Sequence, residues 1–261
     1  MTAGPETTWF DDARFGLFIH WDHASQRGWE LSWPLVGGVF SLPYCQSVSV
    51  DDYHALAVTF DPTAWNPAEL ATRAKAAGMR YMVFTTRHHS GFAMYDSNVS
   101  NHTVMHTPSG RDLTRETVDA FRAEGLRIGL YYSLSDWFHP DYPAFTEEMK
   151  PYVFGTSPAL PSEEQAERFR SYLLAQLEEL MTGYGLIDVV WFDGGWERPA
   201  EWWHPRGDRD AAAQASTRDP HQRPPSRTRR LRNHRAVRPS EQSGWAVGIV
   251  SDDERELGLE R

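Results

Sequence analysis

A repeated alternation of short apolar runs and amphipathic stretches in residues 1–205 is the feature that most constrains the fold. Four runs are almost continuous in apolar side chains and rich in β-branched or aromatic residues, as in parallel strands buried on both faces: residues 15–21, 81–86, 128–133 and 187–192. Three stretches between them place apolar residues at i, i+3 and i+4, which predicts helices: residues 67–77, 113–124 and 162–182. We expect right-handed βα units in an α/β fold, specifically an incomplete (β/α)8 TIM-like barrel of which about the first half is present.

Turn residues and loop composition support this organisation. Each predicted helix ends at a glycine, the residue that most readily adopts the left-handed conformation found after a helix: Gly78, Gly125 and Gly183. The loops that follow the strands are rich in histidine, aromatic and acidic residues. Since βα barrels carry their chemistry at the carboxyl ends of the strands, we expect the functional site there.

Charge and composition exclude several classes of function. The formal net charge of −10 argues against bulk binding to nucleic acid or to an anionic membrane. No stretch approaches the ~18 apolar residues of a membrane helix, and the first residues lack the pattern of a signal peptide. The single cysteine, Cys45, can form neither a disulfide within the chain nor a Cys-rich metal site, so we expect a free thiol and a cytoplasmic location.

Imidazole and phenol side chains stand at the ends of three predicted strands. His88 and His89 close the second strand before a glycine turn, His20 ends the first, and one of Tyr131 and Tyr132 should face inward by alternation. Such histidines can bind a polyol, act as acid or base, ligate a metal ion, or simply be satisfied core groups. We expect no metal site, because no nearby spacing supplies a third and fourth ligand.

The most informative element surrounds Asp193, at the end of the fourth predicted strand. This carboxylate directly follows an apolar run, is flanked by Trp191 and Trp196, and precedes Gly194 and Gly195, which allow a ligand close to the backbone. A solvated loop aspartate would explain the acid but not the tryptophans and glycines around it. A carboxylate between aromatic walls suits attack on, or stabilisation of, an oxocarbenium-like sugar centre, so glycoside hydrolysis is the leading reaction class.

Four segments between residues 9 and 196 resemble the catalytic barrel of α-L-fucosidases, glycoside hydrolase family 29. They occur in the family's order and spacing: WFDDARFGLFIHW, FDPTAWNPAELATRAKAAGMRYMVFTTRHHSGFAMYDS, GRDLTRETVDAFRAEGLRIGLYYSLSDW and VVWFDGGW. The resemblance implies a retaining hydrolase that removes terminal α-L-fucose from a fucosylated glycan or glycoside through a covalent glycosyl-enzyme, without metal or cofactor. By motif position, Asp193 would be the nucleophile, and five residues would line the fucose subsite: His20, His88, His89, Tyr131 and Trp191.

The chain departs from the family pattern at three places. Asp22 follows the His-Trp pair where the family usually has glycine, and the family's Glu-Trp-Tyr element is absent, with Leu42-Pro43-Tyr44 in that neighbourhood. A retaining glycosidase also needs a second carboxyl group about 5 Å from the nucleophile. The family places this acid beyond an Asn-Asp-Arg element, and neither occurs here; Glu197 and Glu201 follow Asp193 but do not match the motif.

Residues 206–261 differ in character from the barrel segment 1–205. They hold 12 of the chain's 26 basic residues, all arginine, and 9 of its 36 acidic ones, and residues 206–244 have no apolar periodicity. Such a tail is typical of a GC-rich gene read out of frame. Shifted forward by one base, the codons for residues 211–226 permit LLRKLQPEILINDRLP, those for 232–237 and the next residue GTTEQFV, and those for 247–258 WESCLTMNESWG, all of which resemble the missing family segments.

We therefore hypothesise a frameshift between residues 205 and 210. It would remove the acid, the arginine and the later strands, so we expect a poorly stable or aggregation-prone chain with little or no fucosidase activity. Two other readings stay open: a non-catalytic sugar-binding barrel or an inactive fragment, and an arginine-rich tether for nucleic acid. The acidic residues of the tail disfavour the tether, and Trp245 is the tail's one Trp, Tyr or Phe.

Overall fold

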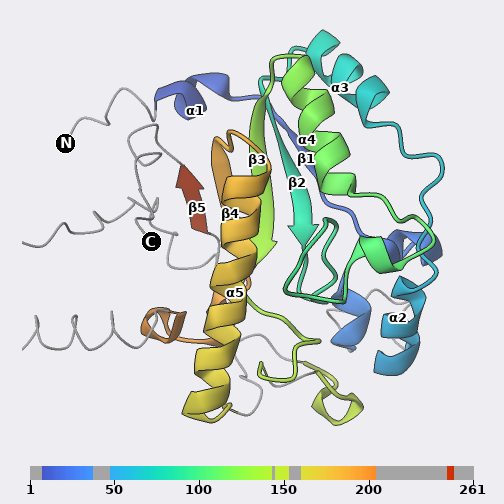
Figure 1. Ribbon diagram of the computed structural model, residues 1–261, viewed down its shortest axis with the longest axis vertical. Coiled ribbons are helices and arrows are strands. Elements are labelled where there is room, and N and C mark those ends of the chain that lie inside the picture. The colour runs from blue at the N-terminus through green and yellow to red at the C-terminus, as the bar shows by residue number, and fades with distance from the viewer. Residues whose placement is uncertain (1–7, 38–47, 143–144, 153–159, 204–245, 250–261) are drawn as a thin grey trace, which may run out of the picture.

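A five-stranded sheet forms the centre of the structure, a computed structural model that describes residues 8–37, 48–142, 145–152, 160–203 and 246–249 (Figure 1). The strands occur in chain order across the sheet: β1 (Leu17–Ile19), β2 (Tyr81–Arg87), β3 (Arg127–Ser133), β4 (Val189–Asp193) and β5 (Ala246–Ile249). The first four are parallel, and β5 pairs antiparallel with β4. The parallel-sheet α/β fold predicted from the apolar runs is therefore present, although β1 is shorter than its predicted range.

Burial explains why β2 and β3 read as continuous apolar runs. In β2 every residue after Tyr81 is buried, and in β3 every residue after Arg127 is buried. The two strands approach closely at Gly129, where an added Cβ would lie 2.7 Å from the carbonyl oxygen of Met82 and 2.8 Å from the Val83 side chain. A glycine is needed at that point of the sheet, because any larger residue would push the strands apart.

Helices alternate with the parallel strands. The α-helices are α1 (Thr8–Ala13), α2 (Val50–Ala57), α3 (Pro67–Ala76), α4 (Leu113–Ala123) and α5 (Glu163–Gly183). Short 3-10 helices lie in the loops: His23–Arg27, Trp33–Leu35, Val104–His106, Glu147–Met149, Gly195–Glu197 and Ala200–Trp203. Phe121 of α4 and Phe169 of α5 join the same buried cluster as Phe84, Leu130 and Val190 of the strands, so these two helices cover the sheet by burying their apolar faces.

Capping residues set where the three predicted helices begin. The side chains of Asn66, Asp112 and Ser162 accept hydrogen bonds from backbone N–H groups in the first turns of α3, α4 and α5, and Ser162 forms a full capping box with Gln165. The helix ends agree less completely with the prediction.

Gly78 and Gly125 have the expected positive φ, 87° and 72°. α5 ends at Gly183, as predicted, but this glycine lacks the expected positive φ; the left-handed residue is Gly185, with φ 72°. At its other edge β4 pairs with β5 over the register Val189 to Phe192.

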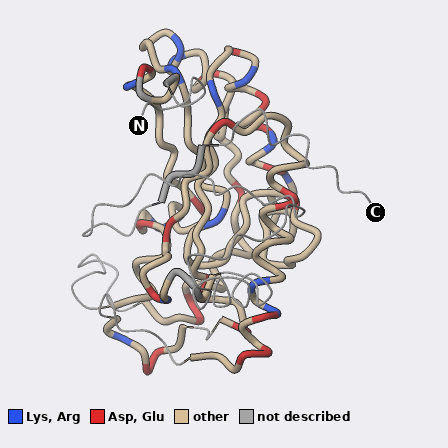
Figure 2. Tube along the Cα trace, turned by 90° about the vertical axis from the view of Figure 1, so that its left-hand side faces the viewer, with Lys and Arg blue, Asp and Glu red and all other residues tan. Residues whose placement is uncertain are grey.

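Several predictions fall outside the described residues. Cys45, the segment Leu42-Pro43-Tyr44 and residues 206–244 are among them, so the free thiol, the cytoplasmic location and the irregular tail stay predictions. None of the described helices combines the length and apolar character needed to cross a bilayer. Figure 2 shows basic residues interspersed with acidic ones along the described chain.

Candidate active site

The predicted site residues gather at the carboxyl ends of the parallel strands. His20 follows β1, His88 and His89 follow β2, and Tyr131 lies in β3; Trp191 and Asp193 end β4. The register between β2 and β3 shifts between Thr85 and Arg87, just before the paired histidines. Irregularities of this kind redirect side chains, and here both imidazoles are buried with ring centroids 4.1 Å apart.

Asp193 is the buried carboxylate of the site, with 3% of its surface exposed. Its Oδ2 accepts a hydrogen bond from the Tyr131 hydroxyl at 2.5 Å, and its Oδ1 accepts one from the Gly194 backbone N–H at 2.7 Å. Burial raises the pKa of Asp193 to about 6, although both hydrogen bonds favour the ionised form. The carboxylate is therefore ionised at pH 7 and held in one orientation.

Gly194 is required by two features of its surroundings. Its φ is +77°, and an added Cβ would lie 2.3 Å from Ser135 Oγ and 3.1 Å from the His89 ring. The glycine thus lets the β4 loop turn directly against the side chains that hold His89.

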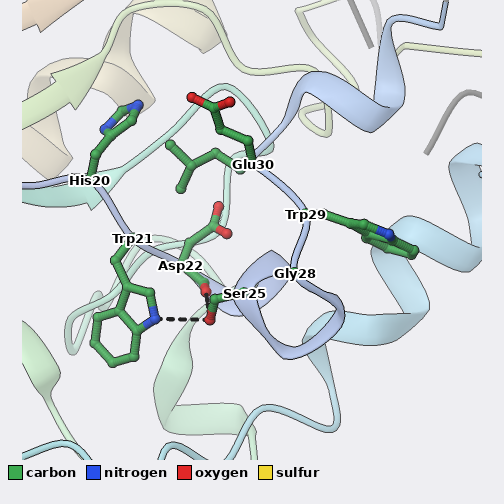
Figure 3. A pocket seen from close by; sticks show the side chains of 8 residues that line it. His20, Trp21, Asp22, Ser25, Gly28, Trp29 and Glu30 are labelled. Atoms are coloured by element: carbon green, nitrogen blue, oxygen red, sulfur yellow. Dashed lines mark hydrogen bonds between the residues drawn. The ribbon is translucent and has the colours of Figure 1, made fainter. Parts of the chain in front are cut away.

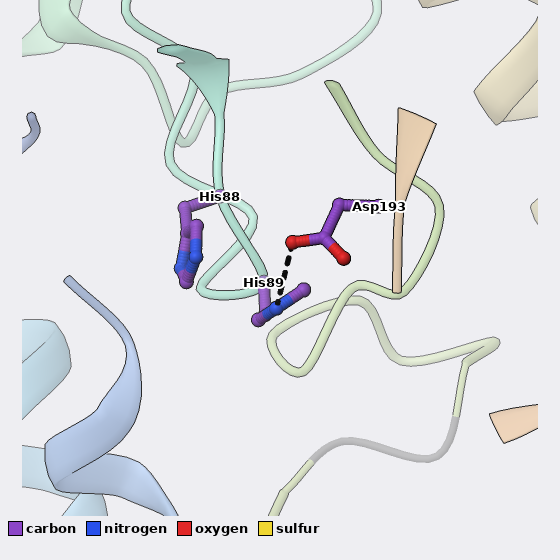
Figure 4. Close-up of side chains that lie close together, drawn as sticks. All are labelled: His88, His89 and Asp193. Atoms are coloured by element: carbon purple, nitrogen blue, oxygen red, sulfur yellow. Dashed lines mark ion pairs between the residues drawn. The ribbon is translucent and has the colours of Figure 1, made fainter. Parts of the chain in front are cut away.

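His89 turns its Nε2 toward Asp193. Its Nδ1 lies 2.6 Å from Ser133 Oγ and 3.0 Å from Ser135 Oγ, so two serine hydroxyls hold the ring in place. Nε2 lies 3.7 Å from Asp193 Oδ2 and has no hydrogen-bond partner among the described residues (Figure 4). Burial lowers the pKa of His89 to about 3, so the ring is neutral.

The tautomer of His88 is defined by a backbone donor. Its Nδ1 accepts a hydrogen bond from the Ser32 backbone N–H at 3.3 Å and lies 2.6 Å from Ser32 Oγ. Burial, with the neighbouring His89 and His20, lowers the pKa of this ring well below its ordinary value. The neutral ring then carries its proton on Nε2. His88 therefore offers a hydrogen-bond donor at Nε2.

His20 and the tyrosines complete the group. His20 Nδ1 lies 3.0 Å from Thr85 Oγ1, and that hydroxyl donates to the Ile19 carbonyl, so Nδ1 is the donor and Nε2 keeps a lone pair. Burial lowers the pKa of His20 to about 4. Its ring packs 5.0 Å from His88 and 5.1 Å from Tyr131.

The alternation expected in β3 is confirmed. Tyr131 points to Asp193, whereas Tyr132 points the other way and donates to Gln176 of α5 at 2.9 Å. Trp191 is partly buried and packs edge to face with Phe18 at 5.3 Å, so an aromatic wall borders the site.

The structure brings together a potential three-ligand metal set that sequence spacing did not supply. One ligand atom from each of His88, His89 and Asp193 lies within 4.8 Å of the others (Figure 4). The hydrogen bonds of these residues disfavour a metal ion. The His88 nitrogen that faces away from Ser32 is protonated, and both Asp193 oxygens already accept hydrogen bonds. A mixed donor and acceptor set of this kind suits hydroxyl groups better than a cation.

A pocket of about 210 Å³ lies beside this cluster, in the loop that follows β1 (Figure 3). Eight residues line it: His20, Trp21, Asp22, Ser25, Gly28, Trp29, Glu30 and Leu31. Pockets for drug-sized ligands run from about 300 to 1,000 Å³, so this one suits a smaller ligand. The sequence prediction included only His20 as a site residue here and missed Glu30, although an acid beside a tryptophan in the first strand loop is the same kind of signal as Asp193.

Glu197 is buried and uses both carboxylate oxygens in hydrogen bonds to other side chains. Its Oε1 accepts a hydrogen bond from Trp137 Nε1 at 2.9 Å, its Oε2 accepts one from the Tyr142 hydroxyl, and the side chain is buried. Trp137 in turn packs against His89, with ring centroids 4.8 Å apart. Glu197 thus ties the β4 loop to the β3 loop and has neither oxygen free for proton transfer. The side chain of Glu201 lies outside the described residues.

Comparison with known proteins gives one family. The family model described as Alpha-L-fucosidase matches residues 2–234. The tissue alpha-L-fucosidase of Rattus norvegicus is 33% identical over 213 residues, covering 78% of this chain and 43% of the relative, and the Homo sapiens protein is 32% identical over 216 residues, with 78% and 42% covered.

Two solved structures are similar to the chain. Alpha-L-fucosidase isoenzyme 1 from Paenibacillus thiaminolyticus has a TM-score of 0.64 at 36% identity, with 81% of this chain and 48% of that one covered. A Bacteroides thetaiotaomicron GH29 alpha-L-fucosidase, trapped as a covalent intermediate with 2-fluoro-fucosyl fluoride, has a TM-score of 0.64 at 29% identity, with 82% and 46% covered. The chain spans less than half the length of these relatives.

Proposed function

The chain belongs to the alpha-L-fucosidase family, and we propose that its site is that of a retaining hydrolase acting on terminal α-L-fucose in a fucosylated glycan or glycoside. The observation that carries the proposal is the buried Asp193 carboxylate, oriented by Tyr131 and Gly194 at the carboxyl end of β4. The covalent intermediate named for the Bacteroides relative supports the same chemistry.

In the proposed reaction Asp193 acts as the nucleophile. Its carboxylate attacks the anomeric carbon, the bond from that carbon to the leaving-group oxygen breaks, and this oxygen takes the electron pair and a proton from an acid. Water then attacks the same carbon, which releases fucose and restores the carboxylate. The aspartate must be ionised for the first step, so the reaction should slow progressively as the pH falls below about 6.

The surrounding donors and acceptors suit the substrate. Fucose carries hydroxyl groups that both donate and accept hydrogen bonds, and His88 would donate to them while His20 would accept. The methyl group of the sugar would pack on the aromatic wall that includes Trp191. This division of roles follows from the hydrogen bonds that fix each imidazole.

The acid that protonates the leaving group is not assigned to a described residue. Glu197 is committed to Trp137 and Tyr142, and we propose that the frameshift between residues 205 and 210 removed the family's acid along with the strands that would complete a barrel. On this proposal the chain keeps its nucleophile and sugar subsite but turns over ordinary glycosides poorly. A reagent with a leaving group that needs no proton therefore tests the nucleophile alone.

The test is labelling with 2-fluoro-fucosyl fluoride, followed by intact-protein and peptide mass spectrometry. Fluoride leaves as an anion, so we expect one fluorofucosyl group on Asp193 and none in Asp193→Asn. Calorimetry with L-fucose is run in parallel. Saturable binding without labelling would support a non-catalytic sugar-binding protein, and the absence of both would show that the chain is an inactive fragment.

A further inference from the structure

Asp22 directly follows the His-Trp pair, and only one of its two carboxylate oxygens is hydrogen-bonded within the described part of the chain. Its Oδ1 accepts a hydrogen bond from the Ala24 backbone N–H at 2.8 Å, which caps the short helix His23–Arg27. Its Oδ2 is buried and has no hydrogen-bond partner in the part of the chain that the structure describes. The His23 ring nitrogen nearest to this carboxylate is 3.9 Å from Oδ1, too far for a hydrogen bond.

The carboxyl group of Asp22 lies at the pocket that follows β1. Asp22 lines the pocket that follows β1, and Figure 3 shows its carboxyl group pointing toward the side of the pocket where His20 and Glu30 lie. His20 forms part of this wall and also packs against His88 and Tyr131. The pocket therefore adjoins the cluster around Asp193, and one small ligand can contact both.

A buried acceptor without a partner is unfavourable, and its presence in a folded protein calls for an explanation. The cap at Ala24 fixes the side chain, so Oδ2 cannot turn to find a bond elsewhere. Burial raises the pKa of Asp22 to about 7, which shows that the protein alone solvates this carboxylate poorly. A ligand hydroxyl in the pocket would supply the missing donor.

We infer that Asp22 is a specificity-determining residue whose Oδ2 accepts a hydrogen bond from one hydroxyl group of the bound sugar. The inference rests on the proposed function, since fucose is the sugar concerned. The glycine usual in the family has no side chain and cannot make this contact, so the contact would be particular to chains with an acid here. Glu30, on the same pocket wall, is the nearest comparable group but is more exposed.

Two variants test the inference by calorimetry with L-fucose. Asp22→Ser keeps an N-cap acceptor but lacks the second oxygen, so the helix start is preserved while the contact is lost. Asp112→Ser is the matched control: Asp112 caps α4 through the Arg115 N–H at 2.8 Å and also accepts from Tyr184 at 2.6 Å, on a helix that contributes no residue to the pocket. We expect Asp22→Ser to bind fucose about 10- to 100-fold more weakly and Asp112→Ser to bind it normally.

Monodeoxy sugars identify the contact. The unaltered chain should lose the same 10- to 100-fold with one of 2-deoxy-, 3-deoxy- and 4-deoxy-L-fucose, about as Asp22→Ser does, and the variant should lose nothing further with that analogue. Equal fucose affinity in Asp22→Ser and the unaltered chain would overturn the inference while leaving the proposed function intact. Failure of the unaltered chain to bind fucose would overturn both.

A third variant covers the case in which Asp22→Ser does not fold, judged by near-ultraviolet circular dichroism. Asp22→Asn preserves the shape and the cap and replaces the charged acceptor with an amide. It should also weaken fucose binding, by at least about threefold. Unchanged affinity in a folded Asp22→Asn would show that the carboxylate makes no contact with the sugar and would overturn the inference.

Discussion

The Tyr131 hydroxyl donates to Asp193 Oδ2 at 2.5 Å, from a strand that pairs directly with the strand of the carboxylate. The hydrogen bond favours the ionised form and opposes the effect of burial on the pKa of Asp193. It also fixes which oxygen faces His89. One phenol therefore sets both the charge and the orientation of the proposed nucleophile.

Removal of that hydroxyl should raise the pH at which Asp193 becomes reactive. In Tyr131→Phe the carboxylate loses its side-chain donor, so its pKa should rise above the present value of about 6, by about one unit or more. The rate of labelling by 2-fluoro-fucosyl fluoride, measured from pH 4 to 9, should show its acid limb displaced upward. Tyr132→Phe is the control, because its hydroxyl bonds Gln176 on the other face; an equal displacement there would contradict the assignment.

The buried charge of Asp193 should destabilise the fold as the pH rises. Its pKa is about 6 in the folded chain and 3.8 ordinarily, so the folded state binds the proton more tightly and stability falls between about pH 4 and 6. Asp193→Asn removes the charge. The variant should gain about 2 kcal/mol over the unaltered chain at pH 8 relative to the difference at pH 4, measured by urea unfolding at both values. A pH-independent difference would show that the charge is not the cause.

Substitution of Gly194 should damage the site by direct contact as well as by backbone strain. A Cβ there meets Ser135 Oγ and the His89 ring, at φ +77°. Gly78→Ala is a matched control, since Gly78 has φ +87° and no atom within 4 Å of an added Cβ. Both variants should lose about 1 kcal/mol or more of stability, but only Gly194→Ala should lose Asp193 labelling, by at least about tenfold. Equal labelling in the two variants would mean that the contact is harmless.

Glu197→Gln separates a structural role from proton donation. The substitution weakens the bonds to Trp137 and Tyr142, so we expect a loss of about 1–3 kcal/mol in unfolding free energy. Labelling and the relative rates on dinitrophenyl and methyl α-L-fucosides should keep their pattern. A selective loss on the methyl fucoside, whose leaving group needs a proton, would instead identify Glu197 as the acid.

The frameshift hypothesis predicts a defined difference at the gene. Sequencing across codons 200 to 215 should reveal a base gained or lost. A chain expressed with the frame restored should hydrolyse methyl α-L-fucoside at least about 100-fold faster than the present chain, because it regains an acid. An intact reading frame, or equal turnover of the two chains, would refute the hypothesis.

The sequence predicted the sheet and most of its helices because their signals are local. The apolar runs that became β2, β3 and β4 need burial on both faces, and the caps at Asn66, Asp112 and Ser162 mark helix starts without reference to the rest of the chain. The helices α1 and α2 were not predicted, and β5 joins the sheet in the opposite direction to the others. Neither short helices nor the direction of an edge strand leaves a periodic pattern in the residues.

The sequence indicated the residues of the candidate site but not which of their ring nitrogens donate and which accept hydrogen bonds. Strand position gave Asp193, the histidines and the pair Tyr131 and Tyr132, and the family resemblance selected Tyr131. The partners that fix the imidazoles, Ser32 and Ser133, are ordinary serines in the sequence and acquire their roles only when segments 44 and 56 residues apart meet. The hydrogen-bonding polarity of a ring depends on such distant neighbours, so no local pattern encodes it.

The opposed tautomers of His88 and His20 have a consequence for modified sugars. A hydroxyl that contacts both rings must receive one hydrogen and surrender its own. An O-methylated position can do only the first, because the ether oxygen has no hydrogen to give. Glycans capped by methylation at that position would therefore be excluded by the two imidazoles, independently of the chemistry at the anomeric centre.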